Sequence, residues 1–201
     1  MTIITNCLDL NKYSELYQDF LHPNPNISSQ AFLKLRKQFE NKFMDNLLAN
    51  LKEEDIFIRR KSILALGMFG EKTLEKIVSL YLQSTNKTVK ASCLKTMIKV
   101  VVNFNLDQLK KEEMQVIDLA LKDDAPEITL TVISLLRQLG ITGRNILIKI
   151  CRDKDLLRAK AAVSALLEMK DQTVADLFDE LINDKSIDPL IKEDIMRDKI
   201  I

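Results

Sequence analysis

DIFIRRKSILAL, residues 55–66, carries the pattern that decides the fold. Counted from Asp55, it has an aliphatic residue at position +3, a base at +4, a small residue at +7 and an apolar pair at +10 and +11. This apolar spacing, which continues to Phe69, places the side chains on one face of a helix. Asp55 precedes that face, where its carboxylate can accept hydrogen bonds from the free N–H groups of the first turn.

The same pattern recurs along the chain, least regularly in its last copy. The copies start at Asn24, Asp55, Asn86, Ala125, Asp155 and Asp188. Consecutive starts lie 31, 31, 39, 30 and 33 residues apart. A period near 30 with two helices per copy is typical of an α-solenoid, in which stacked helix pairs bury a continuous core. The sequence therefore predicts an all-α, HEAT-like superhelix of about six helix pairs, without a sheet, that forms a single domain over residues 1–201.

Each copy supplies the second helix of a pair, and the first helix is expected in the segment before it. These first helices are predicted at 8–21, 39–51, 72–83, 110–121, 143–152 and 173–183. Together with the second helices this gives roughly 10 to 13 helices, because a solenoid of this period repeats a helix pair.

Composition excludes several other classes of protein. The 201 residues are 46% hydrophobic and 29% charged, which suits a globular protein with a buried core. Four Gly and four Pro are too few for the many turns of a β-sandwich or β-barrel. The 30 Lys and Arg balance 29 Asp and Glu, so no basic surplus predicts nucleic-acid binding. There is no apolar run of membrane-spanning length and no basic region typical of a signal peptide. We therefore expect a soluble cytoplasmic protein.

Residues that could carry catalysis are scarce. The single histidine, His22, precedes Pro23 and is therefore expected in a turn. A zinc site needs three or four ligands and a nucleophilic triad needs a base beside its Ser or Cys, so we expect no metal, no triad and no tightly bound cofactor. Cys7, Cys93 and Cys151 are expected to be reduced, and Cys93 at position +7 to be buried and unreactive.

The most basic segment is Arg59-Arg60-Lys61. Arg59 occupies position +4, as do Lys90 and Lys192, and is expected to pair with Asp55 at i,i+4 in a structural ladder along the solenoid. Arg60 belongs to no repeated arrangement. It is therefore a candidate, with Lys61 and Lys90, for binding an anionic ligand or an acidic partner, and a solvated surface is the alternative.

Four segments resemble one family of proteins. They are HPNPNI at 22–27, DIFIRRKSILALGMFG at 55–70, KTVKASC at 87–93 and LKDDAPEI at 121–128. They are similar to the HEAT-like (PBS lyase) repeat bilin lyases of cyanobacteria, of the E/F type. The short chain resembles the phycoerythrin-associated lyase–chaperones most, and the F-type phycocyanin lyase subunit and the phycobilisome-degradation protein are close alternatives.

This resemblance implies a subunit of a phycobilin:cysteine lyase that works with a second HEAT-like subunit. Such a protein assists attachment of a linear tetrapyrrole, here phycoerythrobilin bound transiently, to a Cys of a phycobiliprotein α or β subunit, and helps that subunit fold. The resemblance leaves the catalytic residues unassigned. A non-catalytic scaffold or adaptor for phycobilisome assembly or degradation is the alternative. A solenoid DNA glycosylase would need basic and aromatic residues to hold flipped bases, and the chain has no Trp and no basic surplus.

Overall fold

The computed structural model describes residues 2–170 and 172–199, with side chains for residues 9–170 and 172–197. Within these ranges the chain contains helices and connecting turns and no strand. None of the helices described there is long and apolar enough to cross a bilayer. The helices are α1 (Thr2–Leu21), α2 (Pro25–Gln38), α3 (Glu40–Asn50), α4 (Ile56–Leu66), α5 (Lys72–Gln83), α6 (Lys87–Phe104), α7 (Lys111–Ala120), α8 (Pro126–Gln138), α9 (Gly140–Ile150), α10 (Leu156–Met169), the short 3-10 helix η1 (Gln172–Val174), α11 (Ala175–Asn183) and α12 (Pro189–Lys199).

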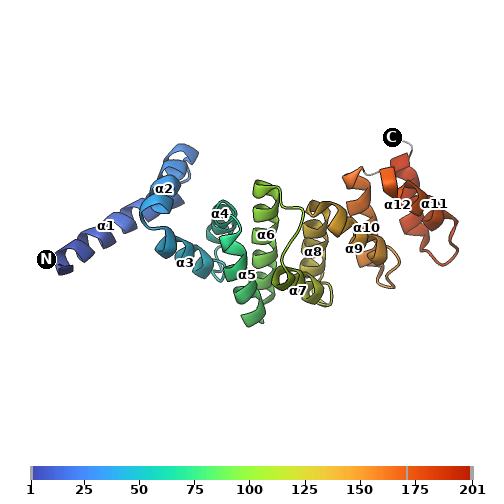
Figure 1. The fold of residues 1–201 in the computed structure, drawn as a ribbon, viewed down its shortest axis with the longest axis horizontal. Helices are drawn as coiled ribbons and strands as arrows, with labels where there is room; N and C mark the ends of the chain where they lie inside the picture. Colours follow the sequence, from blue (N-terminus) through green and yellow to red (C-terminus); the bar gives the residue numbers. More distant parts are fainter. Residues whose placement is uncertain (1, 171, 200–201) are drawn as a thin grey trace.

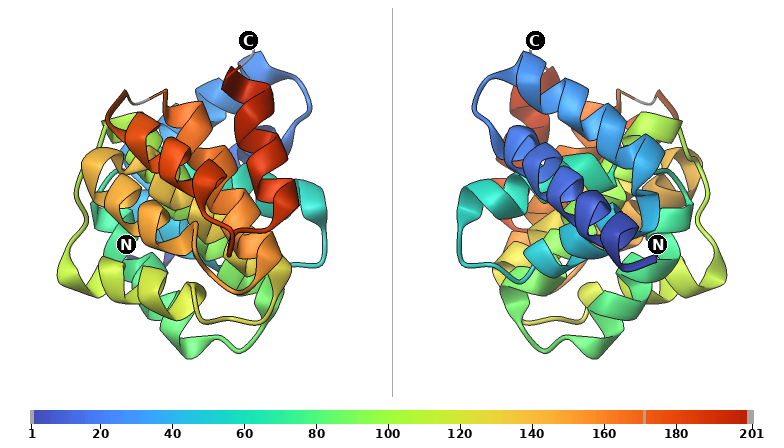
Figure 2. Two further views of the ribbon diagram at one scale, coloured as in Figure 1. Left: turned by 90° about the vertical axis from the view of Figure 1, so that its right-hand side faces the viewer. Right: turned by 90° about the vertical axis from the view of Figure 1, so that its left-hand side faces the viewer.

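The helices form pairs that follow one another in chain order along an elongated body. α1 and α12 lie at its opposite ends (Figure 1), and a view along the long axis places the pairs behind one another (Figure 2). The second helices make the main contacts between pairs, since α6 packs against α4 and α8, and α10 packs against α8 and α12. The predicted all-α superhelix of stacked helix pairs is therefore confirmed.

Polar residues at the repeat starts cap the second helices, as the sequence predicted. The Asp55 carboxylate accepts hydrogen bonds from the N–H groups of Phe57 at 2.7 Å and Ile58 at 3.2 Å. The side chains of Asn24, Asn86 and Asp155 accept equivalent bonds in their own copies. Such caps satisfy N–H groups that have no partner inside the helix, so they define where each second helix begins.

Positions +7 and +11 of each copy hold the repeats together. At +11, the fully buried residues are Leu35, Leu66, Met97, Leu136 and Leu166. At +7, the buried residues are Ala31, Ser62, Cys93, Val132 and Ala162. Burying a Leu or Met side chain contributes about 1.5–3 kcal/mol, so each repeat is stabilised mainly by the neighbours that cover this face.

Ion pairs also connect neighbouring repeats. Lys76 Nζ lies 2.7 Å from Asp45, Arg152 lies 3.0 Å from Glu180, and Lys160 lies 2.9 Å from Asp194. Each pair joins residues about one repeat apart. The Lys76–Asp45 and Arg152–Glu180 pairs are solvent-exposed, and such pairs stabilise by roughly 0–1 kcal/mol each, so they support the stacking that the apolar contacts produce.

The predicted ladder pair of Asp55 with Arg59 is wrong. The Asp55 carboxylate is occupied as the cap of α4, and the Arg59 guanidinium donates instead to the carbonyl oxygens of Glu53 at 2.6 Å and Glu54 at 2.7 Å. Arg59 therefore stabilises the turn between α3 and α4, because carbonyl groups beyond a helix end have no partner in the helix.

Two first helices begin earlier than predicted. α1 begins at Thr2 rather than residue 8, and α9 begins at Gly140 rather than residue 143. Gly140 has φ +51°, a left-handed conformation that lets the chain turn from α8 into α9 within one residue. One turn later, a Cβ at Gly143 would lie 1.7 Å from the carbonyl oxygen of Leu136, so α9 crosses α8 at backbone contact.

Gly143→Ala is therefore expected to destabilise the protein more than Gly140→Ala. The first change forces the backbones of α8 and α9 apart and should cost about 3 kcal/mol. The second places a Cβ in open space and should cost about 1–2 kcal/mol through its left-handed φ. Urea unfolding of both variants measures the difference, and equal stability would contradict the close crossing.

Candidate functional site

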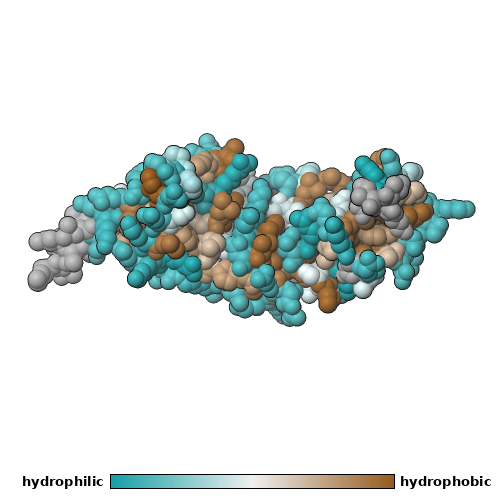
Figure 3. Space-filling view, turned by 90° about the horizontal axis from the view of Figure 1, so that it is seen from above, coloured by the Kyte–Doolittle hydropathy of each residue, from teal (hydrophilic) through white to brown (hydrophobic). Residues whose placement is uncertain are grey.

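A surface groove of about 590 Å³ lies between the turn that joins α1 to α2 and the first turns of α4. A second hollow of about 440 Å³ continues from it between α2 and α4, and the two share Ser28, Ser29, Lys61 and Leu64. We refer to both together as the α2–α4 groove. Its apolar lining includes Phe20, Pro25, Phe32, Leu33, Ile56, Phe57, Leu64 and Met68. Seen from above, the molecule shows several hydrophobic patches among hydrophilic residues (Figure 3).

The groove exists because α2 and α4 pack less closely than the later second helices do. Position +8 holds Phe32 in the first copy, whereas the next four copies carry an aliphatic residue there: Ile63, Leu94, Ile133 and Val163. The Phe32 ring packs against Phe43 and Phe69, with centroids 5.9 and 6.0 Å apart. The Phe32 ring thus packs on residues before and after α4, and it also lines the groove wall.

An aromatic cluster supports the floor of the groove. Neighbouring ring centroids lie between 5.1 and 6.3 Å apart. The members are Tyr13, Tyr17, Phe20, Phe32, Phe39, Phe43 and Phe69. Aromatic pairs contribute about 0.5–1.5 kcal/mol beyond the burial of their area, and most of these rings are held at steep angles to one another. The groove therefore rests on a rigid base and is already formed without a ligand.

Lys61 spans the groove from α4 to the α1–α2 turn. Its Nζ donates to the carbonyl oxygen of His22 at 3.1 Å and lies 5.2 and 5.3 Å from the ring centroids of Phe20 and Phe57. Burial lowers the pKa of the Lys61 ammonium below its ordinary value. An ammonium has three donors, so two remain to hold an anionic group in this partly dry position.

Arg60 lies exposed at the rim of the same groove. Its guanidinium makes no hydrogen bond or ion pair with any residue whose side chain is described, in contrast to Arg59. A free guanidinium presents a planar fork that can bind a carboxylate through two parallel hydrogen bonds. The structure thus brings Arg60 and Lys61, both candidate binding residues, to one apolar groove.

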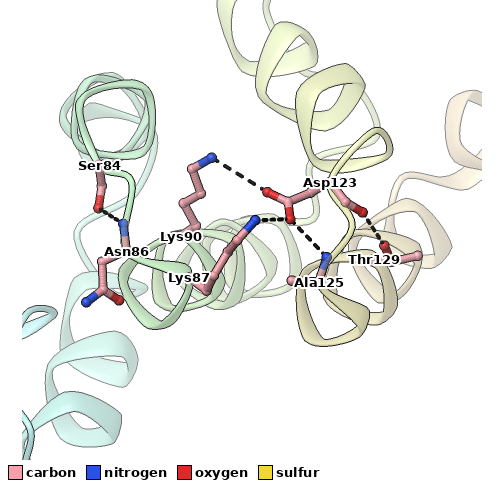
Figure 4. Close-up of polar contacts among 7 residues, drawn as sticks. All are labelled: Ser84, Asn86, Lys87, Lys90, Asp123, Ala125 and Thr129. Atoms are coloured by element: carbon pink, nitrogen blue, oxygen red, sulfur yellow. Dashed lines mark hydrogen bonds and ion pairs between the residues drawn. The ribbon is translucent and has the colours of Figure 1, made fainter.

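Lys90 belongs to a separate polar cluster (Figure 4). Its Nζ lies 3.6 Å from the carboxylate of Asp123, which also accepts hydrogen bonds from Lys87 and, at 3.0 Å, from the Ala125 N–H. Burial acts to raise the pKa of Asp123, but these hydrogen bonds and the two lysine charges outweigh it, so the pKa lies below its ordinary value. The cluster fastens α6 to the start of α8, and a binding role for Lys90 stays a prediction.

The buried cysteines offer no reactive thiol. Cys93 and Cys151 are free and fully buried, and burial raises the pKa of each to about 12. A thiol with so high a pKa supplies almost no thiolate at neutral pH. The predicted burial of Cys93 is confirmed, and the Cys7 side chain lies outside the described residues. In the described part of the chain, no three His, Cys, Asp or Glu side chains are grouped so as to hold a metal ion.

Comparison with known proteins adds a second line of evidence. The chain matches no protein-family model. It is 31% identical over 172 residues to the bilin biosynthesis protein CpeZ of Synechococcus sp. (strain WH8020), an alignment that covers 81% of this chain and 91% of that protein. It is 27% identical over 178 residues to the uncharacterized phycocyanin operon protein Z of Pseudanabaena tenuis (strain PCC 7409), with 88% of each chain covered.

Asp123→Asn should destabilise the protein by about 1–2 kcal/mol at pH 7, because two lysines lose a nearly buried carboxylate. Asp45→Asn is the matched control and should cost less than about 0.5 kcal/mol, since its ion pair with Lys76 is exposed. The lowered pKa of Asp123 means that its stabilisation is present above the unfolded pKa of about 3.9 and is lost as pH falls through the folded pKa. Urea unfolding at pH 7 and pH 3 tests this: a difference from wild type that is as large at pH 3 as at pH 7 would show that the charge plays no part.

Proposed function

We propose that this chain, which belongs to the family of CpeZ-like bilin biosynthesis proteins, is a subunit of a phycobilin lyase. In this proposal it binds a linear tetrapyrrole transiently and assists thioether attachment of that bilin to a cysteine of a phycobiliprotein α or β subunit. We further propose phycoerythrobilin as the bilin, a second HEAT-like chain as the working partner, and assistance to the folding of the acceptor subunit. The name and near full-length alignment of the CpeZ relative support the bilin-related part of this proposal.

The observation that carries the proposal is the pairing of charge and apolar surface in the α2–α4 groove. A bilin has a flat conjugated body and two propionate groups. The groove offers apolar and aromatic walls beside Lys61 and the unpartnered Arg60. Its 590 Å³ outer part falls within the size range of small-molecule sites, about 300–1,000 Å³. In this proposal the propionates lie at Arg60 and Lys61, and the ring system lies against Phe57 and Leu64.

In this proposal the chain positions the bilin for reaction with the acceptor cysteine. Thioether formation adds a thiol S–H across a carbon–carbon double bond of the bilin, so a C–S bond forms, a π bond is lost and the proton ends on the bilin. This addition needs no oxidant and no leaving group. Because Cys93 and Cys151 are buried with raised pKa values, the thiol in this proposal comes from the acceptor subunit.

A non-catalytic adaptor for phycobilisome assembly or degradation is the second candidate function. One observation favours it, because the single imidazole in the groove is already used for structure. His22 Nδ1 accepts a hydrogen bond from the Asn24 N–H at 3.0 Å and so fixes the turn that leads into α2. Binding of bilin by the purified chain separates the two functions, since an adaptor would remain colourless.

Arg60→Ala tests the groove, and Arg59→Ala is its matched control on the same helix. Arg60→Ala should leave the melting temperature within about 1 °C of wild type, because this side chain has no partner to lose. It should lower bilin attachment several-fold when co-expressed with a phycoerythrin subunit, the second HEAT-like chain and a phycoerythrobilin pathway. Arg59→Ala should cost about 0.5–1 kcal/mol through its lost hydrogen bonds and leave attachment per folded molecule unchanged.

The readouts are thermal melts and the visible absorbance of the acceptor subunit. Early melting of Arg60→Ala together with normal attachment would show that the residue is structural. Full attachment by this chain without the second HEAT-like chain would contradict the proposed partnership.

A further inference from the structure

Every charged residue on α2, α4 and α6 is basic. They are Lys34, Arg36, Lys37, Arg59, Arg60, Lys61, Lys87, Lys90, Lys95 and Lys99. All 29 Asp and Glu residues of the chain therefore lie elsewhere, and the formal net charge of +1 conceals this separation. The later second helices do carry acidic residues, with Glu127 on α8 and Glu168 on α10. The charged residues of the second helices are thus all basic in α2, α4 and α6 and of both signs in α8 and α10.

The repeat register places some of these bases beside exposed apolar side chains. Position +9 is Leu33 on α2, Leu64 on α4 and Lys95 on α6, and all three are exposed. Position +13 is Lys37, Met68 and Lys99 in the same order. Leu33, Leu64 and Met68 remain 62%, 53% and 45% exposed. We refer to these six residues as the basic–apolar face. The same two positions in α8 and α10 hold Ser134, Gln138, Ser164 and Glu168.

The α4 and α6 parts of this face are in direct contact. Asn103 of α6 donates through Nδ2 to the carbonyl oxygen of Gly67 at 3.0 Å and to Met68 Sδ at 3.3 Å. Gly67 also lets the helices approach closely, because a Cβ there would lie 2.4 Å from the Lys99 Cβ. Met68 and Lys99 therefore adjoin each other, and the hollow between α2 and α4 lies between Leu33 on one side and Leu64 and Met68 on the other.

The bases of this face lack partners. Lys37, Lys95 and Lys99 form no hydrogen bond or ion pair with any residue whose side chain the structure describes. By contrast, Lys87 and Lys90 are held by Asp123. Several unneutralised positive charges around exposed Leu and Met side chains repel one another and favour an opposite charge brought by another molecule.

We propose that the basic–apolar face docks an acidic amphipathic helix of a partner protein. The apolar ridge of that helix would cover Leu33, Leu64 and Met68, and its flanking carboxylates would meet Lys37, Lys95 and Lys99. This arrangement is the helix-in-groove mode of recognition, with charge providing the choice of partner. A protein helix fits better than an anionic membrane, because Leu33, Leu64 and Met68 line a hollow that can receive the ridge of a helix.

The test uses the full chain and two labelled peptides of about 18 residues, long enough to form a helix on binding. Both carry the same leucine ridge, flanked by Glu in one and by Lys in the other. Fluorescence anisotropy should show binding of the Glu peptide, at least 10-fold weaker binding of the Lys peptide, and an affinity for the Glu peptide that falls as salt is added. Equal binding of the two peptides, or no binding of the Glu peptide, would overturn the proposal.

Variants locate the interaction on the chain. Lys95→Glu with Lys99→Glu should weaken binding of the Glu peptide at least 10-fold, and so should Lys37→Glu with Lys95→Glu, which alters only exposed side chains. Lys122→Glu with Lys154→Glu, exposed lysines outside the face, is the control and should not change it. Wild-type affinity in either test variant would exclude this face as the site.

A final arm uses vesicles rich in phosphatidylglycerol. Vesicle binding that exceeds peptide binding and is lost in the same variants would assign the face to a membrane and overturn the proposal. None of these measurements contains bilin or a phycobiliprotein. A failed docking test therefore leaves the proposed lyase function standing, and a failed attachment assay leaves the docking surface standing.

Discussion

Each helix pair of this chain has an apolar face that only the next pair can cover. Positions +7 and +11 of the second helices lie one helical turn apart and point into this interface, where Leu66 and Leu136 lose all their solvent exposure. The elongated shape follows, because a chain that buries its core between neighbours grows in one direction (Figure 1). The same register turns positions +9 and +13 outward in the early pairs. Residues such as Leu33 and Leu64 are thus exposed and available for binding.

The first contact between pairs departs from this regular stacking, and the candidate site lies there. Phe32 stands where later copies have aliphatic side chains and packs on the aromatic cluster, and α2 contacts α4 less closely than the later second helices contact one another. The space that opens is crossed by Lys61, whose ammonium is held between two rings and a carbonyl oxygen. A repeat protein can form a pocket by leaving one interface incomplete, provided that a rigid base replaces the missing contacts. The rings of Phe20, Phe32, Phe43 and Phe69 form such a base.

The sequence predicted features that depend on residue spacing within one helix, and it missed features that depend on contacts between helices or on a choice between hydrogen-bond partners. The repeat, its N-caps and the burial of Cys93 follow from spacing along one helix, and the segments around His22, Asp55, Lys87 and Leu121 indicated the family. The i,i+4 spacing of Asp55 and Arg59 allowed an ion pair. In the structure the Asp55 carboxylate caps α4 instead, and the Arg59 guanidinium donates to the carbonyl oxygens of Glu53 and Glu54. The α2–α4 groove depends on a distance between helices that lie a full repeat apart. The basic–apolar face was concealed because the total charge sums over helices that point to different surfaces.

The two proposed sites overlap, so a partner bound at one changes the surroundings of the other. Leu33, Leu64 and Met68 belong both to the groove wall and to the basic–apolar face. A partner helix docked on that face would therefore cover part of the groove and remove water from it. Ionic contacts strengthen several-fold when the effective dielectric constant falls from that of water toward that of a protein surface, so Arg60 and Lys61 would hold a carboxylate more firmly once the partner is in place. If both proposals hold, we expect the chain to bind its anionic ligand weakly alone and more tightly in a complex. The thiol that the buried cysteines cannot supply would then come from the same assembly that closes the groove.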